Sequence, residues 1–290
     1  MHQEPHEMSF EYSITYKAEN EYENPVENAS WQFLIVPENN DTQELMRVDI
    51  KNSLGAKNEF SENGYGFRTV RINTLEKFQK LNFRATFKLK KKSFNPFAQV
   101  PIFNIASNYE LVQSLDFKVD FEPFLGHTKF TTLPQASINL FVFDTALSIF
   151  DNLQKLNTWV YQFIKFNTGV THVNTLLKEI LENPEGVCQD FTHLFCALAR
   201  ANKIPARYVS GYLHQGNGYF GDSQMHAWAE TYVPQVGWVG FDPTNNLLVD
   251  DNHIKVAHGK DFNDCSPLKG VVYSHGANKT SHSVEVQAQQ

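Results

Sequence analysis

The stretch "EGVCQDFTHLFCALAR", residues 185–200, places a cysteine at the start of an amphipathic helix. Apolar residues recur at helical spacing after Cys188, and Pro205 requires the helix to end by Lys203. A helix N-terminus carries unpaired backbone N–H groups and a partial positive charge, which favour a thiolate and can stabilise an oxyanion. Free cysteines are more often small buried hydrophobic residues, so the position of Cys188 alone does not establish a catalytic role.

A second segment supplies the partners that a catalytic thiol needs. "MHAWAETYVPQVGWVGFDPTNN", residues 225–246, predicts a hairpin that turns at PQVG. Counting back from the turn brings Asp242 opposite the residues just after His226, so a small register offset would let the carboxylate orient the imidazole. Together with Cys188, this histidine and this aspartate fill the roles of a Cys-His-Asp catalytic triad.

Four segments of the second half of the chain carry a family resemblance. They are "GVCQDFTHL" (186–194), "IPARYVSGYL" (204–213), "HAWAETYVPQVGWVGFDPTNN" (226–246) and "HIKVAHGKDFNDCSPLKGVVY" (253–273). Together they resemble the bacterial transglutaminase-like superfamily, and the β-rich first half is similar to the N-terminal domain that often accompanies this core. The resemblance implies a papain-like α+β fold with Cys188 as nucleophile, His226 as base and Asp242 as third member. It leaves the second oxyanion donor unassigned.

The chain divides into a β-rich half and an α+β half. Alternating apolar residues predict strands in "FEYSITY" (10–16), "LNFRATFKLKKK" (81–92) and "LDFKVDF" (115–121). The basic run at the end of the second of these is predicted to be a solvated strand end. Apolar residues recur at helical spacing from residue 143 to 181. We therefore predict an all-β, sandwich-like domain over residues 1–132 and the catalytic domain over residues 133–290.

The end of the chain returns to a strand pattern. Alternation in "VVY" (271–273) and "SVEVQA" (283–288) predicts a closing pair of strands.

Composition excludes several classes of partner. The formal net charge of -7 over 290 residues offers no basic stripe for nucleic acid and no lysine cluster for an acidic membrane. The N-terminal residues lack the basic and apolar regions of a signal peptide, so we expect a cytoplasmic protein. Three cysteines are too few and too irregularly spaced for a disulfide framework. Cys196 is predicted to be core, and Cys265 a loop or packing thiol.

No metal and no cofactor are predicted, but one alternative concerns zinc. Thiolate, imidazole and carboxylate are acceptable zinc ligands, so the three triad residues could bind that ion instead. The other histidines of the second half lack the helical spacing of a zincin. We expect His193, His253 and His258 to lie at the surface.

The sequence thus predicts a cysteine-dependent enzyme that attacks a protein or peptide substrate and forms a thioester at Cys188. Water as acceptor makes the protein a cysteine protease or amidase, and a lysine amine makes it a cross-linking transglutaminase. Hydrolysis is favoured because nothing in the sequence identifies a site that shields the thioester from water. Gln189, Trp228 and Trp238 are candidate cleft residues, although each tryptophan is an equal candidate for the core. A non-catalytic binding scaffold is the alternative of another class, and the oligomeric state is not predicted.

Overall fold

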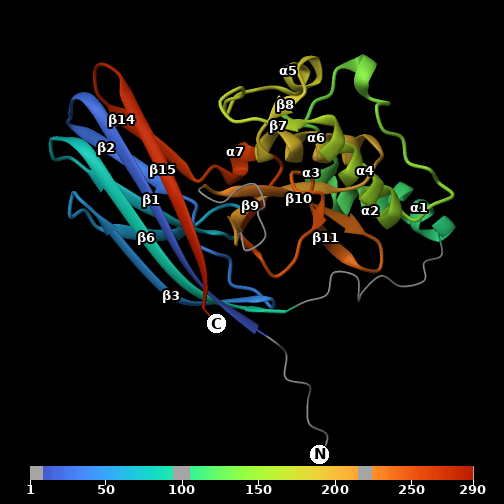
Figure 1. Cartoon of the computed structure of the whole chain (residues 1–290), viewed down its shortest axis with the longest axis horizontal. Coiled ribbons are helices and arrows are strands. Elements are labelled where there is room, and N and C mark those ends of the chain that lie inside the picture. The colour runs from blue at the N-terminus through green and yellow to red at the C-terminus, as the bar shows by residue number, and fades with distance from the viewer. Residues whose placement is uncertain (1–8, 94–104, 215–223, 290) are drawn as a thin grey trace, which may run out of the picture.

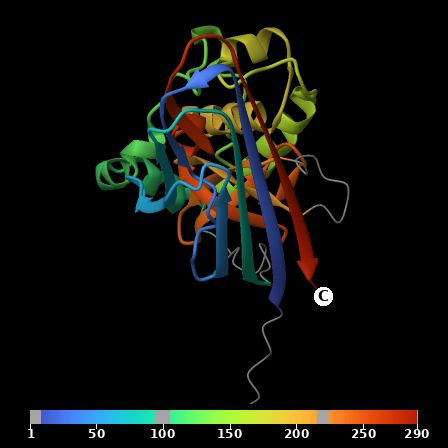
Figure 2. The same ribbon diagram turned by 90° about the vertical axis from the view of Figure 1, so that its left-hand side faces the viewer.

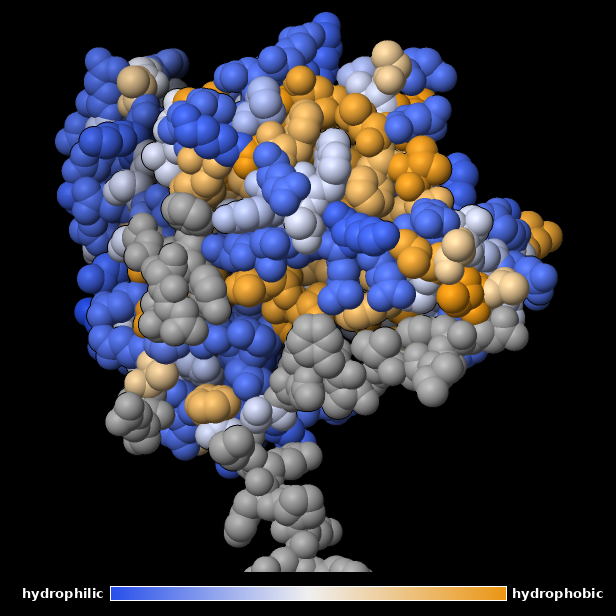
Figure 3. All heavy atoms as spheres, turned by 45° about the vertical axis from the view of Figure 1, so that its right-hand side comes forward, coloured by the Kyte–Doolittle hydropathy of each residue, from blue (hydrophilic) through white to orange (hydrophobic). Residues whose placement is uncertain are grey.

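The computed structural model describes residues 9–93, 105–214 and 224–289. A β-sandwich of two sheets lies on one side of the molecule, and a third, five-stranded sheet with the helices lies on the other (Figure 1). Figure 3 shows a mostly hydrophilic surface over the sandwich and several apolar patches over the helical side. Within the described residues, no helix is both long and apolar enough to cross a membrane.

The sandwich is built from two four-stranded antiparallel sheets. The first has the order β15-β1-β6-β3, with β1 (Ser9–Val26), β3 (Gln43–Asn52), β6 (Phe78–Lys92) and β15 (Asn278–Gln289). The second has the order β14-β2-β5-β4, with β2 (Asn28–Phe33), β4 (Asn58–Glu62), β5 (Arg68–Thr74) and β14 (Leu268–Tyr273). The inner faces meet in an aromatic core, where the rings of Phe33 and Phe83 stack 3.9 Å apart. The strands predicted at residues 10–16 and 81–92 are confirmed.

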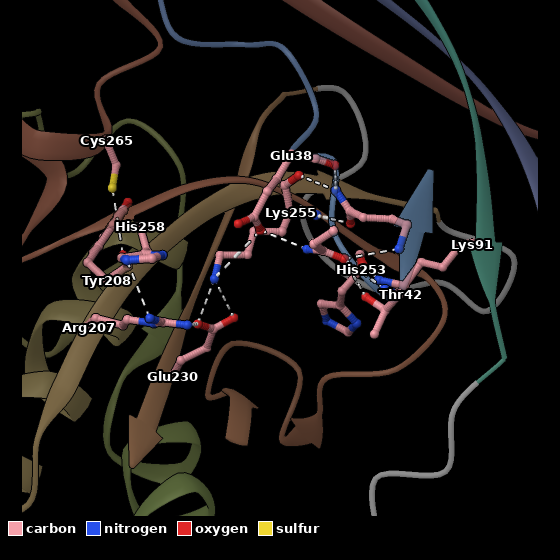
Figure 4. Close-up of polar contacts among 12 residues, drawn as sticks. Glu38, Thr42, Lys91, Arg207, Tyr208, Glu230, His253, Lys255, His258 and Cys265 are labelled. Carbon is pink, nitrogen blue, oxygen red and sulfur yellow. Dashed lines mark hydrogen bonds and ion pairs between the residues drawn. The ribbon is translucent and has the colours of Figure 1, made fainter. Parts of the chain in front are cut away.

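Lys91 is not part of a solvated strand end, as we predicted for the basic run. It follows Phe87 and Leu89 on the inner face of β6 and is only 4% exposed. Its Nζ donates a hydrogen bond to the backbone carbonyl of His253 (Figure 4), and burial lowers its pKa to about 8. Because side chains alternate between the two faces of a strand, Lys91 points inward like Phe87 and Leu89. The backbone carbonyl of His253 gives its buried ammonium group a hydrogen-bond partner.

The last two strands correct the predicted domain boundaries. β14 pairs with β2 and β15 pairs with β1, so they do not pair with each other but close one sheet each. Figure 2 shows β1 and β15 running side by side, and β15 pairs with β1 along its whole length. The sandwich therefore combines residues 9–93 with residues 268–289, and the second unit ends before β14.

The predicted strand at residues 115–121 is also wrong, because the segment is helical. Ser114 caps the helix by accepting a hydrogen bond from the N–H of Phe117. Phe117 and Phe121 contact each other and Tyr232, whereas Leu115 is 75% exposed. An alternating pattern also places apolar residues four positions apart, which share one face of a helix. Here Phe117 and Phe121 form that face, and it packs against the core.

Residues 105–214 and 224–265 form what we call the α+β unit. Its helices are α1 (Ile105–Gln113), α2 (Leu115–Asp120), α3 (Glu122–Leu125), α4 (Ile149–Phe163), α5 (Leu177–Glu182), α6 (Cys188–Ala201) and α7 (Phe262–Cys265), with a 3-10 turn η1 (Gln135–Ser137). Its antiparallel sheet has the order β12-β11-β10-β9-β13, from β9 (Ala206–Leu213), β10 (His226–Val233), β11 (Gly237–Asp242), β12 (Leu247–Leu248) and β13 (His253–Gly259). Two short parallel strands, β7 (Lys165–Phe166) and β8 (Glu185–Gly186), precede α6.

The arrangement around α6 confirms the predicted fold class. The helix packs against β9 and β10 and buries Phe191, Leu194 and Phe195 completely. The predicted hairpin is present, with β10 and β11 paired up to the turn after Val233. A cysteine-bearing helix on an antiparallel sheet, accompanied by a β-sandwich, is the α+β architecture expected from the sequence.

Directional hydrogen bonds fasten the sandwich to the sheet of the α+β unit. The side chain of Gln43 pairs in both directions with the backbone of Lys255, donating at 2.7 Å and accepting at 3.0 Å. The hydroxyl of Tyr212 donates to the carbonyl of Ile35 at 2.6 Å. Because these bonds are directional and buried or half-buried, they fix how the two parts sit relative to each other.

Candidate active site

Cys188 is the first residue of α6, and its side chain is half-buried. Asp190 closes the start of the helix: its Oδ2 accepts hydrogen bonds from the N–H of Val187 and the hydroxyl of Thr171, both at 2.8 Å. A side chain at Gly186 would collide with that carboxylate, which explains the glycine. These contacts hold the thiol at a helix N-terminus, where the N–H groups of the first turn favour an anion.

His226 and Asp242 form a buried pair beside the thiol. Nε2 of His226 lies 2.8 Å from Oδ2 of Asp242, and both side chains are fully buried. This contact assigns Nε2 to the carboxylate and leaves Nδ1 of His226 without a hydrogen-bond partner of good geometry among the described residues. Cys188 and His226 line one cleft, and the sulfur lies close enough to the imidazole to raise its pKa, after the larger effect of Asp242.

The pKa values of this pair are strongly shifted. Burial alone lowers the pKa of His226, but the carboxylate of Asp242, and then the sulfur of Cys188, outweigh it and raise the value to about 10. Burial likewise raises the pKa of Asp242, but the histidines outweigh it and hold the value well below its usual range. The imidazole therefore keeps its proton at neutral pH, and the carboxylate stays ionised.

The aspartate is held from several sides. Its Oδ1 accepts hydrogen bonds from the backbone N–H groups of Thr244 and Asn245, at 3.0 and 3.2 Å. Its Oδ2 accepts a further bond from Nδ2 of Asn245 at 2.8 Å. These contacts come from the turn that follows Pro243, so the local sequence "DPTNN" both ends the strand and orients the carboxylate.

His253 is a site residue that the sequence reasoning missed. We expected it at the surface, but its side chain is fully buried and its Nε2 lies 3.2 Å from Oδ2 of Asp242. Its Nδ1 lies 2.9 Å from Oδ1 of Asp250. The one local signal was its position at the start of a strand with alternating apolar residues. No pairing rule could reveal the contact, because β9 and β10 separate β13 from β11 in the sheet.

The other two histidines also differ from expectation. His193 is 1% exposed, stacks on Phe130 and accepts a hydrogen bond from the N–H of Phe262, and burial lowers its pKa to about 3. His258 is half-buried beside Arg207, and burial lowers its pKa to about 2. Both are neutral packing residues rather than surface groups.

The two remaining cysteines are chemically unlike Cys188. Cys196 and Cys265 are completely buried. Burial raises the pKa of Cys196 to about 11 and that of Cys265 well above its ordinary value. Cys196 is core, as predicted, and Cys265 is a packing thiol.

The candidate cleft residues divide. Gln189 lines the cleft that contains Cys188, whereas the described residues of that cleft include neither tryptophan. Trp228 is 1% exposed and packs against the rings of His226 and His253, so it supports the site from behind. Trp238 instead stacks under the guanidinium of Arg207, 4.0 Å away.

The ion pairs near Trp238 form a separate cluster. The carboxylate of Glu230 accepts a hydrogen bond from Nζ of Lys255 at 2.8 Å and pairs with Arg207 (Figure 4). Burial raises the pKa of Glu230, but these two cations outweigh it and lower the value to about 2. The buried carboxylate is thus held by two cations from neighbouring parts of the same sheet.

A metal ion could find ligands here only at the expense of the hydrogen bonds just described. Among the described residues, His226, Asp242 and His253 offer one ligand atom each within 4.8 Å of one another. The same atoms already form the imidazole–carboxylate contacts, and the group does not include Cys188. The donor set therefore fits a histidine oriented for proton transfer better than a zinc centre.

Fold and site together define an α+β protein with a cysteine at a helix N-terminus facing a buried histidine–aspartate pair. Residues 142–243, which include all three side chains, match the family described as the transglutaminase-like superfamily. This part of the chain therefore resembles a transglutaminase-like domain.

Relatives with known sequences match part of the chain. The uncharacterised protein Rv2569c of Mycobacterium tuberculosis is 39% identical over 135 residues, which cover 43% of this chain and 43% of the relative. A protein-glutamine gamma-glutamyltransferase of Pseudomonas aeruginosa is 34% identical over 83 residues, 27% of this chain and 12% of that protein. The chain thus spans less than half the length of these relatives.

A solved structure extends the similarity to the whole fold. The crystal structure of a candidate cysteine protease from Cytophaga hutchinsonii superposes with a TM-score of 0.78 at 21% identity, and the match covers 98% of this chain and 92% of that one. The similarity therefore includes the sandwich as well as the α+β unit, and it shows a shared fold.

Proposed function

We propose that this protein is a cysteine-dependent acyl-transfer enzyme that uses Cys188, His226 and Asp242 as a catalytic triad. The observation that carries the proposal is the buried contact of 2.8 Å between His226 Nε2 and Asp242, which leaves Nδ1 for the half-buried thiol at the start of α6. A histidine that keeps its proton at neutral pH beside a cysteine fits a thiolate–imidazolium pair.

In the proposed reaction, the thiolate of Cys188 attacks the carbonyl carbon of an amide. The S–C bond forms, and the carbonyl oxygen becomes an oxyanion beside the N–H groups at the start of α6. The C–N bond then breaks, and the leaving amine takes the proton from Nδ1 of His226. A thioester remains on Cys188. The neutral imidazole accepts a proton from the second substrate, which attacks the thioester and releases the thiolate.

Hydrolysis is the preferred second half of the reaction. Cys188 is half-buried and lines a cleft, so water has access to the thioester. Transfer to a lysine amine, as a cross-linking transglutaminase performs, is the second candidate. The similarity to the Pseudomonas aeruginosa gamma-glutamyltransferase supports that alternative. The buried, ordered His226–Asp242 pair argues against a scaffold without catalysis.

One experiment tests the activity and separates its two forms. Dimethylated casein is incubated with the protein and dansylcadaverine, and labelled casein, released ammonia and new peptide N-termini are measured. We expect Cys188→Ala to lower every product at least roughly a thousandfold. Cys196→Ala, a change in the core of α6 away from the cleft, is the matched control. More labelled amide than acid products would establish transfer, and equal rates for wild type and Cys188→Ala would favour the scaffold.

Two further proposals concern the protein's setting. We keep the cytoplasm as its location, which fractionation of cells expressing the full-length protein would test. The proposed substrate is a protein or peptide.

A further inference from the structure

The sandwich forms one wall of the cleft that contains Cys188. The cavity has a volume of about 510 Å³, within the range of sites that enclose a ligand of several hundred daltons. The α+β unit contributes the start of α6 and the end of β10. The sandwich contributes inward-facing residues of four strands: Asn20 and Tyr22, Trp31, Gly270 and Val272, and Asn278 and Thr280.

The cleft reaches in between the two sheets of the sandwich, at the edges formed by β14 and β15. Among the described residues, β14 and β15 each form one of the two edges of their sheet. Gly270 lies directly over Trp31, where an added Cβ would come within 2.9 Å of the indole. The glycine thus leaves the face of the sandwich core accessible from the cleft.

The charge of the cleft restricts its ligand. None of the described residues that line it is a lysine, an arginine or a glutamate. Its one aspartate, Asp190, is occupied by the hydrogen bonds that start α6. Apart from its histidines and the N–H groups at the start of α6, the described part of the lining offers a ligand no positive charge, so it suits an uncharged chain.

Asn20 provides a specific contact for such a chain. It is 3% exposed, and its Oδ1 accepts a hydrogen bond from the hydroxyl of Thr280 at 2.7 Å. With Oδ1 used in that bond, the amide nitrogen Nδ2 of Asn20 is the group left to donate. It has no hydrogen-bond partner among the described residues. A buried donor without a partner is costly, and an acceptor on a ligand in the cleft would remove the cost.

We propose that the β-sandwich is the substrate-recognition wall of this enzyme, and that the cleft binds an uncharged polypeptide segment. A backbone carbonyl of the segment accepts a hydrogen bond from Asn20 Nδ2, and an apolar side chain packs against Trp31 and Val272. The inference rests on the proposed function, since Cys188 defines where the scissile amide lies. It gives the sandwich a role in binding, and the hydrogen bonds at Gln43 and Tyr212 keep the wall in place.

Covalent peptide probes test this proposal. Tetrapeptides carry either an N-terminal chloroacetyl group or a C-terminal chloromethyl ketone, so that both chain directions are sampled, and chloroacetamide serves as the probe without a peptide. Alkylation of Cys188 is followed by mass spectrometry. We expect saturable, faster alkylation by neutral peptides than by chloroacetamide, and slower alkylation by peptides that contain lysine or glutamate.

Two variants locate the recognition. Asn20→Leu should raise the half-saturating concentration of the best neutral peptide by roughly three- to tenfold, without changing the rate at saturation or the rate with chloroacetamide. Asn157→Leu, at a buried asparagine of α4 outside the cleft, is the control for loss of a buried amide. Gly270→Ala should act like Asn20→Leu, and Gly64→Ala, where a Cβ meets open space, should not.

The outcomes separate the two proposals. If no peptide alkylates Cys188 faster than chloroacetamide, or if Asn20→Leu and Gly270→Ala behave like their controls, the recognition wall is wrong. The triad is tested independently, by whether His226→Ala slows alkylation by chloroacetamide itself.

Discussion

His253 and Asp242 are joined by a buried contact of 3.2 Å, on the same carboxylate oxygen that meets His226 at 2.8 Å. One carboxylate therefore serves two imidazoles, one facing the thiol and one facing the interior. Because Lys91 of the sandwich bonds the backbone of His253, the contact also links the sandwich to the site.

Replacing His253 should disturb the orientation of Asp242 without touching the substrate. We expect His253→Leu to lower kcat on the casein substrate roughly tenfold with little change in KM, because a hydrogen bond to a charged group is lost. His253→Gln, whose amide can still donate to Asp242, should recover part of the loss. His258→Leu, on the same strand but without contact to Asp242, is the control. Equal KM and kcat in wild type and His253→Leu would show that His253 only packs.

Gly186 should be required for the start of α6. Gly186→Ala places a Cβ against the carboxylate of Asp190, and we expect a loss of about 1–3 kcal/mol in the free energy of unfolding. The thiol of Cys188 should also react more slowly with iodoacetamide, since the helix start moves. Urea denaturation and alkylation kinetics measure the two effects, with Gly64→Ala for comparison. Wild-type stability in Gly186→Ala would refute the explanation of this glycine.

The raised pKa of His226 predicts how stability depends on pH. The value rises from 6.5 in the unfolded chain to about 10 in the folded protein. Between these values the folded protein holds a proton that the unfolded chain has lost. The stabilisation is thus complete below pH 6.5 and disappears as the pH rises through 10.

His226→Gln should abolish that dependence. Urea denaturation measures the free energy of unfolding of both proteins at several pH values from 6 to 10.5. Over this range the value for wild type should fall, relative to that for the variant, by an amount on the order of a few kcal/mol. A difference between the two proteins that stays constant with pH would mean that the imidazole is not charged in the folded state.

Zinc should inhibit rather than activate. The ion would have to displace the hydrogen bonds that orient His226, since its ligand atoms are the same ones. We expect added Zn²⁺ to slow alkylation of Cys188 reversibly, and dialysis against a chelator to leave the rate and the melting temperature of the purified protein unchanged. A chelator that lowers either quantity would support the zinc alternative.

The sequence was sufficient to predict contacts between residues that lie close together in the chain. The thiol at a helix start follows from the pattern after Gly186, and the His226–Asp242 contact follows from the register of one hairpin. Both lie within short stretches, where periodicity and turn chemistry determine geometry. The nearby "DPTNN" turn holds the aspartate for the same reason.

The missed features depend on contacts between distant segments. His253 reaches Asp242 across two intervening strands, and Lys91 is buried only because β13 offers it a carbonyl. The strands β14 and β15 were predicted, but not their partners, because β2 and β1 lie at the other end of the chain. In residues 115–121, an alternation compatible with both a strand and a helix was resolved by the cap at Ser114 and by packing against Tyr232.

The most direct test of the central claim is the rate at which iodoacetamide alkylates each cysteine of the native protein at pH 7. Peptide mass spectrometry follows the three thiols separately in wild type and in His226→Ala. The triad predicts that Cys188 reacts quickly, that Cys196 and Cys265 stay unmodified, and that Cys188 reacts at least tenfold more slowly in the variant. Equal rates at Cys188 in the two proteins would contradict the account, because the histidine would then not activate the thiol.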